Sequence, residues 1–243
     1  MNRITLPSGE NVPALGQGTW YMGERPSELR READALRLGM DLGMTLIDTA
    51  EMYNDAELVV AEALAGRREK AFVVSKVLPS NAACKNTITA CERSLRRLNI
   101  ECLDLYLLHW RSSTPIDETF RAFEQLVQDG KIRYYGVSNL DEFDMQDALA
   151  AAGGQAMQTN QVLYNLNSRG IEWDLLPLCQ QLNIPIMAYS PLDQARLDSS
   201  ALDDIARRHN ASACQIALAW VLHQPGVIAI PKAVDPMHVK QNA

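Results

Sequence analysis

The sequence predicts an α/β protein of the (β/α)8 TIM-barrel class, for two reasons. Its 243 residues (27.0 kDa) fit one such barrel, a fold that commonly reaches this length as a single domain. From Leu15 onward, short apolar runs also alternate with longer helical patterns, which is typical of repeated strand–helix units on a parallel sheet. No change in composition marks a linker, so residues 1–243 are expected to form one domain.

Eight short apolar runs are the candidate strands. They span residues 15–18, 45–47, 71–75, 103–108, 132–137, 156–160, 185–188 and 227–230. Eight is the number of strands that closes a β/α barrel, whereas an open doubly wound sheet usually has fewer. Ahead of them, two short segments that turn at residues 7–11 are expected to form a β-hairpin capping the bottom of the barrel.

The stretches between these runs have helical patterns. The candidate helices span residues 27–42, 56–64, 85–98, 116–128, 141–150, 172–182, 199–208 and 212–223. Ser27, Asp117 and Asp141 each precede a glutamate and are expected to accept backbone hydrogen bonds at helix starts. Gly16-Gln17-Gly18 superficially resembles a dinucleotide-binding loop, but Tyr21 stands where its third glycine should be, so that fingerprint fails.

The composition argues against several kinds of partner. Hydrophobic residues make up 47% and charged residues 22%, as in globular proteins. The net charge of −7, without a Lys/Arg cluster, argues against nucleic acid. Residues 1–7 contain no apolar signal segment and no run approaches the ~18 apolar residues of a spanning helix, so a cytoplasmic protein without membrane contact is expected. Scattered cysteines and histidines predict reduced thiols and no metal, and we expect a monomer or weak oligomer.

Four polar side chains come just after three of the candidate strands. Asp48 and Tyr53 follow the second strand, Lys76 the third and His109 the fourth. Barrel enzymes place their working groups at the carboxyl ends of the strands, so these residues are expected to meet at one mouth. Each residue alone could be structural: Asp48 could cap a helix, and Tyr53 could be a packed ring. Lys76 could be solvated at its end, and His109 could be a hydrogen-bonded imidazole in the core. Together they favour a catalytic site.

This set of groups can protonate a carbonyl oxygen. A tyrosine phenol, with an ordinary pKa near ~10, is a poor acid unless something stabilises its anion, and the Lys76 ammonium can do so. Asp48 would keep Lys76 charged, and a neutral His109 could orient the substrate oxygen. Ser75 and Ser138 have no evident histidine base, which disfavours acyl transfer. Carbonyl protonation calls for a hydride or carbanion, and a hydride demands a cofactor.

Several segments, in order along the chain, resemble the signatures of the aldo-keto reductases. They are LIDTAEMY at 46–53, VSKV at 74–77, LDLYLLHW at 103–110, GKIRYYGVSN at 130–139, AYSPL at 188–192 and IAIPK at 228–232. The resemblance runs from about residue 12 to the C-terminus. It implies an enzyme on a (β/α)8 barrel that uses NADPH to reduce small aldehydes and ketoaldehydes, of the methylglyoxal type or aromatic.

The resemblance also implies individual roles. Tyr53 would be the general acid, Lys76 and Asp48 its tuning pair, and His109 the orienting donor. The cofactor contacts would be Ser138, Asn139 and Gln161 at the carboxamide, Tyr189 against the nicotinamide ring, and Ser190 and Leu192 on the pyrophosphate side. Trp20, after the first strand, and Trp110, beside His109, would form apolar walls around the reacting carbonyl.

The adenosine end of the expected cofactor site departs from the family pattern. Lys232 follows the eighth strand, where an ammonium can pair with a 2′-phosphate. Ala233 replaces the family's serine, and His238 replaces an arginine. Asn242 matches an adenine contact, while Gln241 replaces a glutamate. Because a planar cation is lost, we expect a moderate preference for NADPH over NADH.

Two alternatives remain open at the level of sequence. A non-catalytic NADP(H)-sensing barrel subunit that binds a partner protein would keep the cofactor residues without turning over carbonyls. A barrel aldolase would use Lys76 as a Schiff base, which the charge of Asp48 disfavours. The sequence also stops at Asn242-Ala243 inside the expected last helix, and residues 193–199 form a short segment, so we expect absent residues. An intact mass near 27.0 kDa would contradict this.

Overall fold

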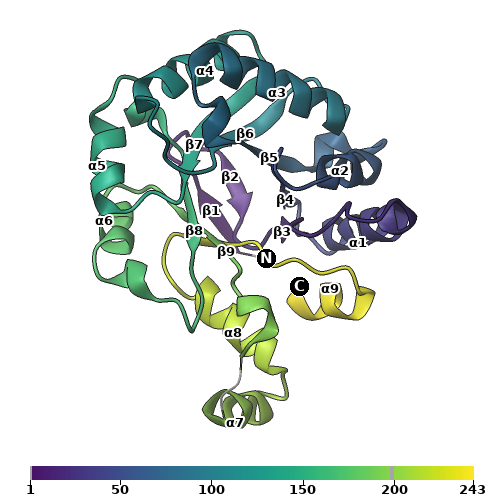
Figure 1. Cartoon of the computed structure of the whole chain (residues 1–243). Helices are drawn as coiled ribbons and strands as arrows, with labels where there is room; N and C mark the ends of the chain where they lie inside the picture. Colours follow the sequence, from purple (N-terminus) through teal and green to yellow (C-terminus); the bar gives the residue numbers. More distant parts are fainter. Residues whose placement is uncertain (1, 198–199) are drawn as a thin grey trace.

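A closed parallel barrel forms the centre of the molecule (Figure 1). The computed structural model describes residues 2–197 and 200–243, and within them eight parallel strands form one sheet in chain order. The strands are β3 (Gln17–Gly18), β4 (Leu46–Asp48), β5 (Phe72–Val77), β6 (Leu103–Leu108), β7 (Ile132–Ser138), β8 (Asn160–Leu163), β9 (Ile186–Tyr189) and β10 (Val227–Ala229). A parallel bridge between Leu15 and Ala229 closes the sheet, and the predicted fold class is confirmed.

Two glycines allow the first strand segment to close against the last. The backbone N–H of Gly16 donates to the Ala229 carbonyl at 2.8 Å, and that of Gly18 donates to the Pro231 carbonyl at 3.0 Å. A Cβ on Gly18 would lie 2.8 Å from the carbonyl oxygen of Ile230, so this close approach requires glycine. The glycine pair that superficially resembles a nucleotide loop therefore belongs to the barrel wall.

Helices surround the barrel. They are α1 (Leu29–Asp41), α2 (Ala56–Leu64), α3 (Cys84–Leu98), α4 (Ile116–Gln128), α5 (Glu142–Ala150), α6 (Leu175–Gln181), α7 (Ser200–His209), α8 (Ala213–Leu222) and α9 (Pro236–Asn242). Short 3₁₀ helices are η1 (Pro26–Glu28), η2 (Arg68–Lys70), η3 (Pro79–Asn81), η4 (Gly154–Ala156), η5 (Gly170–Glu172) and η6 (Asp193–Ala195). Figure 1 shows α7 as an extra helix lying outside the ring that covers the barrel. No helix in the described ranges is both long and apolar enough to cross a membrane.

Several element boundaries differ from the sequence prediction, among them those of β8, α6 and α7. β8 begins at Asn160 rather than at residue 156, because residues 154–156 form η4. Helix α6 begins at Leu175 rather than 172, since the Asp174 side chain accepts a hydrogen bond from the Leu175 N–H at 2.6 Å and starts the helix there. The predicted first residue of α7, Ser199, lies outside the described residues. Short apolar runs mark an element without fixing its ends.

One of the three predicted helix caps is confirmed. The Asp141 carboxylate accepts a hydrogen bond from the Asp144 N–H at 2.9 Å at the start of α5. Ser27 instead lies inside η1, and α4 begins after Pro115, so Asp117 lies in its first turn. Both predictions were wrong because a proline with fixed φ already sets the entry of the chain at each place.

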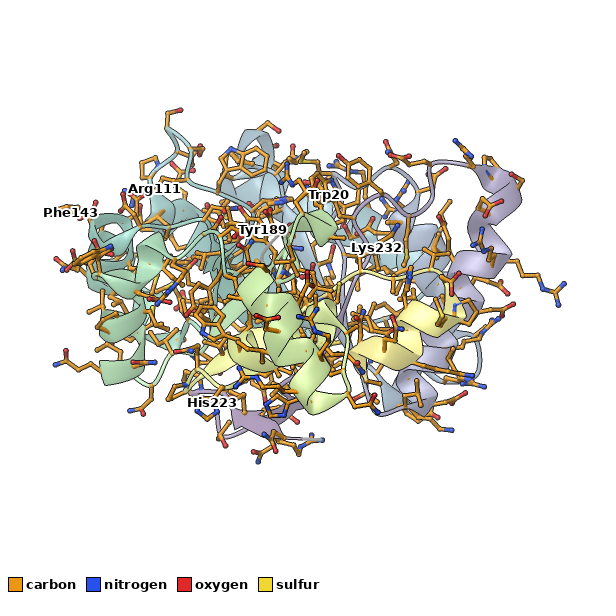
Figure 2. All side chains as sticks on the ribbon, turned by 90° about the horizontal axis from the view of Figure 1, so that it is seen from below. Trp20, Arg111, Phe143, Tyr189, His223 and Lys232 are labelled. Atoms are coloured by element: carbon orange, nitrogen blue, oxygen red, sulfur yellow. The ribbon has the colours of Figure 1, made fainter. Side chains whose placement is uncertain are left out.

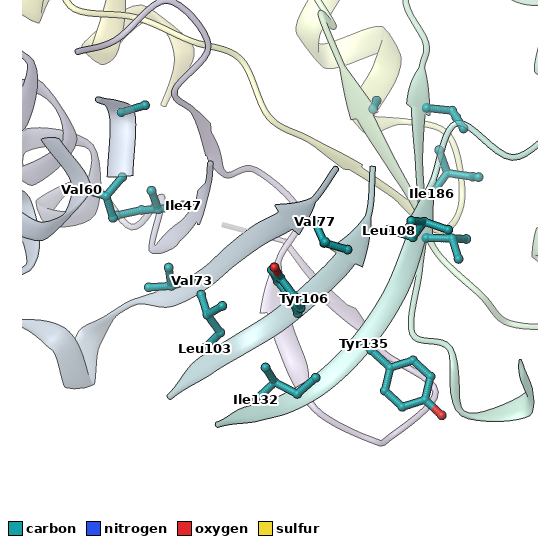
Figure 3. Packing of buried hydrophobic residues seen from close by; sticks show 14 of the residues in the cluster. Ile47, Val60, Val73, Val77, Leu103, Tyr106, Leu108, Ile132, Tyr135 and Ile186 are labelled. Atoms are coloured by element: carbon teal, nitrogen blue, oxygen red, sulfur yellow. The ribbon is translucent and has the colours of Figure 1, made fainter. Parts of the chain in front are cut away.

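Two apolar layers hold the barrel together. Inside it, a cluster contains Leu46, Phe72, Val74, Leu105, Leu107, Met187, Ile228 and Ile230, together with Leu6 and Val12. Leu6 and Val12 belong to the N-terminal hairpin, in which β1 (Arg3–Thr5) pairs antiparallel with β2 (Asn11–Pro13), so the predicted cap of the barrel is confirmed. The outer layer, between strands and helices, includes Ile47, Val73 and Tyr106 (Figure 3).

Candidate active site

Strand alternation directs three candidate catalytic side chains into the barrel. Successive side chains of a strand point to opposite faces, so residues two apart share a face. Asp48, Lys76 and His109 each lie two residues beyond a member of the inner cluster, namely Leu46, Val74 and Leu107. The predicted meeting of these residues at one mouth follows from the same pattern that builds the core.

A buried ion pair lies at the centre of the site. The Lys76 Nζ donates to Asp48 Oδ1 at 2.9 Å, to Asp48 Oδ2 at 2.8 Å and to the Thr49 carbonyl at 2.8 Å. Burial is the largest single influence and lowers the pKa of Lys76, but the Asp48 carboxylate and the Tyr53 phenol together raise it by more, so the pKa lies above its ordinary value. The ammonium is therefore charged and fully hydrogen-bonded, as the sequence predicts.

The phenol of Tyr53 lies beside this ion pair. The Lys76 Nζ is 5.0 Å from the centroid of the Tyr53 ring. Burial raises the pKa of Tyr53, the Lys76 ammonium opposes that rise, and the net pKa is raised. The sequence predicts that Lys76 lowers the pKa of Tyr53, and this effect has the predicted direction but is outweighed by burial.

The chain just after Tyr53 is held in place by Arg97. Its side chain donates to Glu57 at 3.0 Å and to Asp55 at 3.1 Å.

His109 is a neutral imidazole in this setting. Burial, and then the Lys76 charge, lower the pKa of His109 to about 3. Its ring packs edge-on to the Tyr53 ring, with centroids 5.8 Å apart. Among residues 2–197 and 200–243, its buried Nδ1 has no hydrogen-bond partner. An N–H left unpaired there would be costly, so the proton belongs on Nε2, which can donate to a substrate oxygen.

The lowered pKa of His109 predicts a pH-dependent stability. In the folded protein the His109 ring resists protonation, whereas in the unfolded chain it takes up a proton below pH ~6.5. The contribution of the neutral ring to the unfolding free energy is therefore fully present above pH ~6.5 and is lost as the pH falls towards 3. Between pH 7 and pH 5, a His109→Gln variant should lose about 2 kcal/mol less unfolding free energy than the parent protein. Urea unfolding at both pH values measures this. His209→Gln, on an exposed residue, is the control, and equal losses in all three proteins would contradict the expectation.

The predicted carboxamide-binding residues form one hydrogen-bonded network. The Ser138 hydroxyl and the Asn139 N–H both donate to the Gln161 carbonyl at 2.8 Å. The Asn139 amide donates to the His109 carbonyl at 3.0 Å and accepts from the Tyr189 hydroxyl at 3.0 Å. Asn139 has a φ of 56°, a left-handed conformation that asparagine tolerates. The ends of β7, β8 and β9 are thus joined beside the catalytic candidates.

A cavity of about 910 Å³ opens over these groups. The predicted site residues on its wall are Trp20, Asp48, Tyr53, His109, Trp110, Ser138, Asn139, Gln161, Tyr189, Ser190, Leu192, Lys232, His238 and Asn242. Lys76 is fully buried beneath it. Figure 2 shows Trp20 and Tyr189 far from His223, which marks the other end of the barrel. The structure therefore brings the predicted residues together, at the carboxyl ends of the strands.

Several wall residues were missed by the sequence prediction. Tyr21 stacks on Trp20 with ring centroids 4.3 Å apart, and Met52 precedes Tyr53 in the same wall. Their positions next to Trp20 and Tyr53 were an available signal. Cys214 and Ser212 also line the cavity from the start of α8, where Ser212 caps the helix with Gln215. That capping box is visible in the sequence, but it does not indicate which cavity the helix end faces.

Lys232 lies on the wall of the cavity. Its side chain is exposed and forms no ion pair with any described residue. His238, Gln241 and Asn242 reach the same cavity from α9. A free ammonium at the end of β10 fits the expected position of an anionic group.

Comparison with known proteins finds many matches, among them two reductases and two solved structures. Methylglyoxal reductase YeaE of Escherichia coli (strain K12) is 58% identical over 248 residues, covering 99% of this chain and 87% of that protein. Glyoxal reductase of Bacillus subtilis (strain 168) is 35% identical over 244 residues, covering 99% and 85%. A Klebsiella pneumoniae aldo/keto reductase solved with NADP and acetate has a TM-score of 0.96 at 51% identity, covering 99% and 88%. An aldo-keto reductase of that organism solved with NADPH has the same TM-score and identity, covering 100% and 89%.

The family assignment follows from these matches together with the geometry. The sequence profile of the Aldo/keto reductase family matches residues 14–243, nearly the whole chain. Relatives above 30% identity cover it almost completely. The predicted oxidoreductase class and fold agree with this result. The chain belongs to the Aldo/keto reductase family.

Proposed function

We propose that this protein uses NADPH to reduce small aldehydes and ketoaldehydes, of the methylglyoxal type or aromatic, to alcohols. The observation that carries the proposal is the group of Asp48, Lys76, Tyr53 and His109 at the floor of one cavity. Methylglyoxal reductase YeaE and the B. subtilis glyoxal reductase support the ketoaldehyde assignment. The Klebsiella structures with NADP and NADPH support the cofactor.

The wall of the cavity suits a dinucleotide. Asn139 and Gln161 place side-chain amides there, Tyr189 adds a half-buried ring, and Lys232 adds an exposed ammonium. These are the groups that a carboxamide, an aromatic ring and a phosphate require. Ser138, Ser190, Leu192, His238 and Asn242 complete the proposed contact set. When bound, NADPH supplies the hydride that a carbonyl carbon accepts.

Proton delivery is the work of the chain's own residues. The Tyr53 phenol donates its proton to the carbonyl oxygen, and the nearby Lys76 ammonium stabilises the phenolate left behind. Asp48 holds Lys76 charged, so the ammonium cannot act as a Schiff-base amine, which argues against the aldolase alternative. His109 donates from Nε2 to the substrate oxygen and sets its direction.

The substrate end of the cavity favours neutral, apolar carbonyl compounds. Trp20 and Trp110 lie on its wall, joined by Tyr21 and Met52. These four side chains are partly exposed, which leaves their apolar surfaces free to contact a ligand. Methylglyoxal and phenylglyoxal fit these walls, and phenylglyoxal adds an aromatic ring that can pack on an indole.

One assay tests this function. Purified protein, NADPH and methylglyoxal or phenylglyoxal should give substrate-dependent loss of NADPH absorbance, with NADH as a matched cofactor. Glyoxylate, a charged aldehyde, should be reduced less efficiently because the apolar walls offer its carboxylate no partner. Binding of NADPH without any turnover across the panel would favour the non-catalytic sensing subunit instead.

Lys232 should determine the preference for NADPH. In a Lys232→Met variant, KM for NADPH should rise about tenfold, because a charge-assisted contact to the 2′-phosphate is lost, while KM for NADH should stay nearly the same. The matched control is Lys240→Met, an exposed lysine of α9 that does not line the cavity. Equal changes with both cofactors would place the 2′-phosphate elsewhere.

A further inference from the structure

We propose that Gln161 is a positioning residue for the proton donor, because its side-chain amide holds the Asp48 carboxylate in place for Lys76. The inference rests on the proposed function and adds a role beyond contact with the cofactor. Gln161 would connect the wall of the cofactor cavity to the ion pair that supports Tyr53.

The contact between Gln161 and Asp48 crosses the barrel. β4 and β8 are four strands apart in an eight-stranded barrel, so they face each other across its interior. The Gln161 Nε2 donates to Asp48 Oδ1 at 2.7 Å, and both side chains are buried. An ionised carboxylate can only accept, so the NH₂ end of the amide must face it. The orientation of Gln161 is therefore fixed by Asp48.

This amide is the second side chain that holds the Asp48 carboxylate. Oδ1 accepts from both Lys76 and Gln161, while Oδ2 accepts from Lys76. Two donors from different strands fix the plane of the carboxylate. The amide also takes up part of the negative charge of Asp48, which leaves more of the Lys76 charge directed at the phenol. Loss of the amide should therefore make Tyr53 a weaker acid.

The rest of Gln161 ties it to the cavity wall. Its carbonyl accepts from the Ser138 hydroxyl and the Asn139 N–H, both at 2.8 Å. Within the described chain, its side-chain Oε1 accepts no hydrogen bond, and the residue lines the cavity. The Nε2 end of the amide thus faces Asp48, while the residue also lies on the wall of the cavity. A ligand that contacts Gln161 also contacts the support of the proton donor.

The test uses Gln161→Met, which keeps the length of the side chain and removes the donor. At saturating NADPH, kcat should fall about tenfold, as expected for losing a hydrogen bond to a charged group. The alkaline limb of the kcat profile should move to higher pH. In the cofactor-free protein, ultraviolet titration of the Tyr53 phenol, taken as the difference from Tyr53→Phe, should move the same way.

Ser138→Ala is the matched control. Ser138 lies beside Gln161 on the cavity wall but, in the described structure, its hydroxyl bonds the Gln161 carbonyl rather than Asp48. This control should raise KM for NADPH and leave the Tyr53 titration in place. If Gln161→Met behaves like Ser138→Ala, with a raised KM for NADPH and an unchanged titration of the Tyr53 phenol, Gln161 is only a cofactor contact and the proposal is wrong.

A second variant keeps the test decisive if Gln161→Met does not fold. In Gln161→Glu, the introduced carboxyl repels Asp48 when ionised, but when protonated it can donate to Asp48 as the amide does. Its kcat, relative to the parent protein, should therefore recover as the pH falls, and the absence of recovery would overturn the proposal. The phenol titration needs no turnover, so it also judges Gln161 if the parent protein proves inactive with every carbonyl.

Discussion

Replacing Tyr53 with phenylalanine should lower kcat for aldehyde reduction by ~10²–10⁴-fold, the usual contribution of a general acid. The ring and its packing against His109 are kept, so the change removes the acidic proton and little else. Steady-state assays with methylglyoxal at saturating NADPH measure the loss. The alkaline limb of the kcat profile should disappear with the phenol that produces it.

The same variant should still bind NADPH. Among the residues that the structure describes, the proposed cofactor residues form their own hydrogen-bonded network, in which the Tyr189 hydroxyl donates to Asn139 and Tyr53 takes no part. Quenching of intrinsic fluorescence by NADPH should give a Kd close to that of the parent protein. A variant that retains the kcat of the parent protein would end the assignment of Tyr53 as the acid.

The catalytic residues were predictable because each follows a short apolar run that is visible in the sequence. Asp48, Lys76 and His109 lie at the carboxyl ends of three neighbouring strands, where barrel enzymes place their working groups. The family resemblance then added the residues of the cavity wall. The structure places them in one cavity, although their contact with a cofactor is still a proposal.

Other features could not be predicted because they depend on contacts between distant residues. The bond from Gln161 to Asp48 joins residues 113 positions apart and requires two facing strands in the right register. The raised pKa of Tyr53 reflects burial, which outweighs the charge of Lys76. The sequence names both charges but does not show how much water the folded site excludes. Cys214 reaches the cavity from the start of α8, and no periodicity in the sequence shows which cavity that helix end faces.

Lys76→Met should be the most disruptive substitution in the site, because it leaves the buried Asp48 carboxylate without its ion-pair partner. Breaking one half of a buried pair typically costs about 3–5 kcal/mol of unfolding free energy. Catalysis should also fall sharply, since the Tyr53 phenolate loses its neighbouring cation. Urea unfolding at pH 7 measures the first effect, and NADPH oxidation with methylglyoxal measures the second.

The double variant Asp48→Asn/Lys76→Met separates stability from catalysis. With both charges removed, most of the lost unfolding free energy should return, while activity should stay low because no cation supports the phenolate. Because the folded pKa of Lys76 is raised, its charge should stabilise the parent protein fully below pH ~10, and this stabilisation should weaken as the pH rises further. The double variant should not show this loss of unfolding free energy at high pH. If the double variant regained activity together with stability, Lys76 would serve only to neutralise Asp48, and its electrostatic role toward Tyr53 would be wrong.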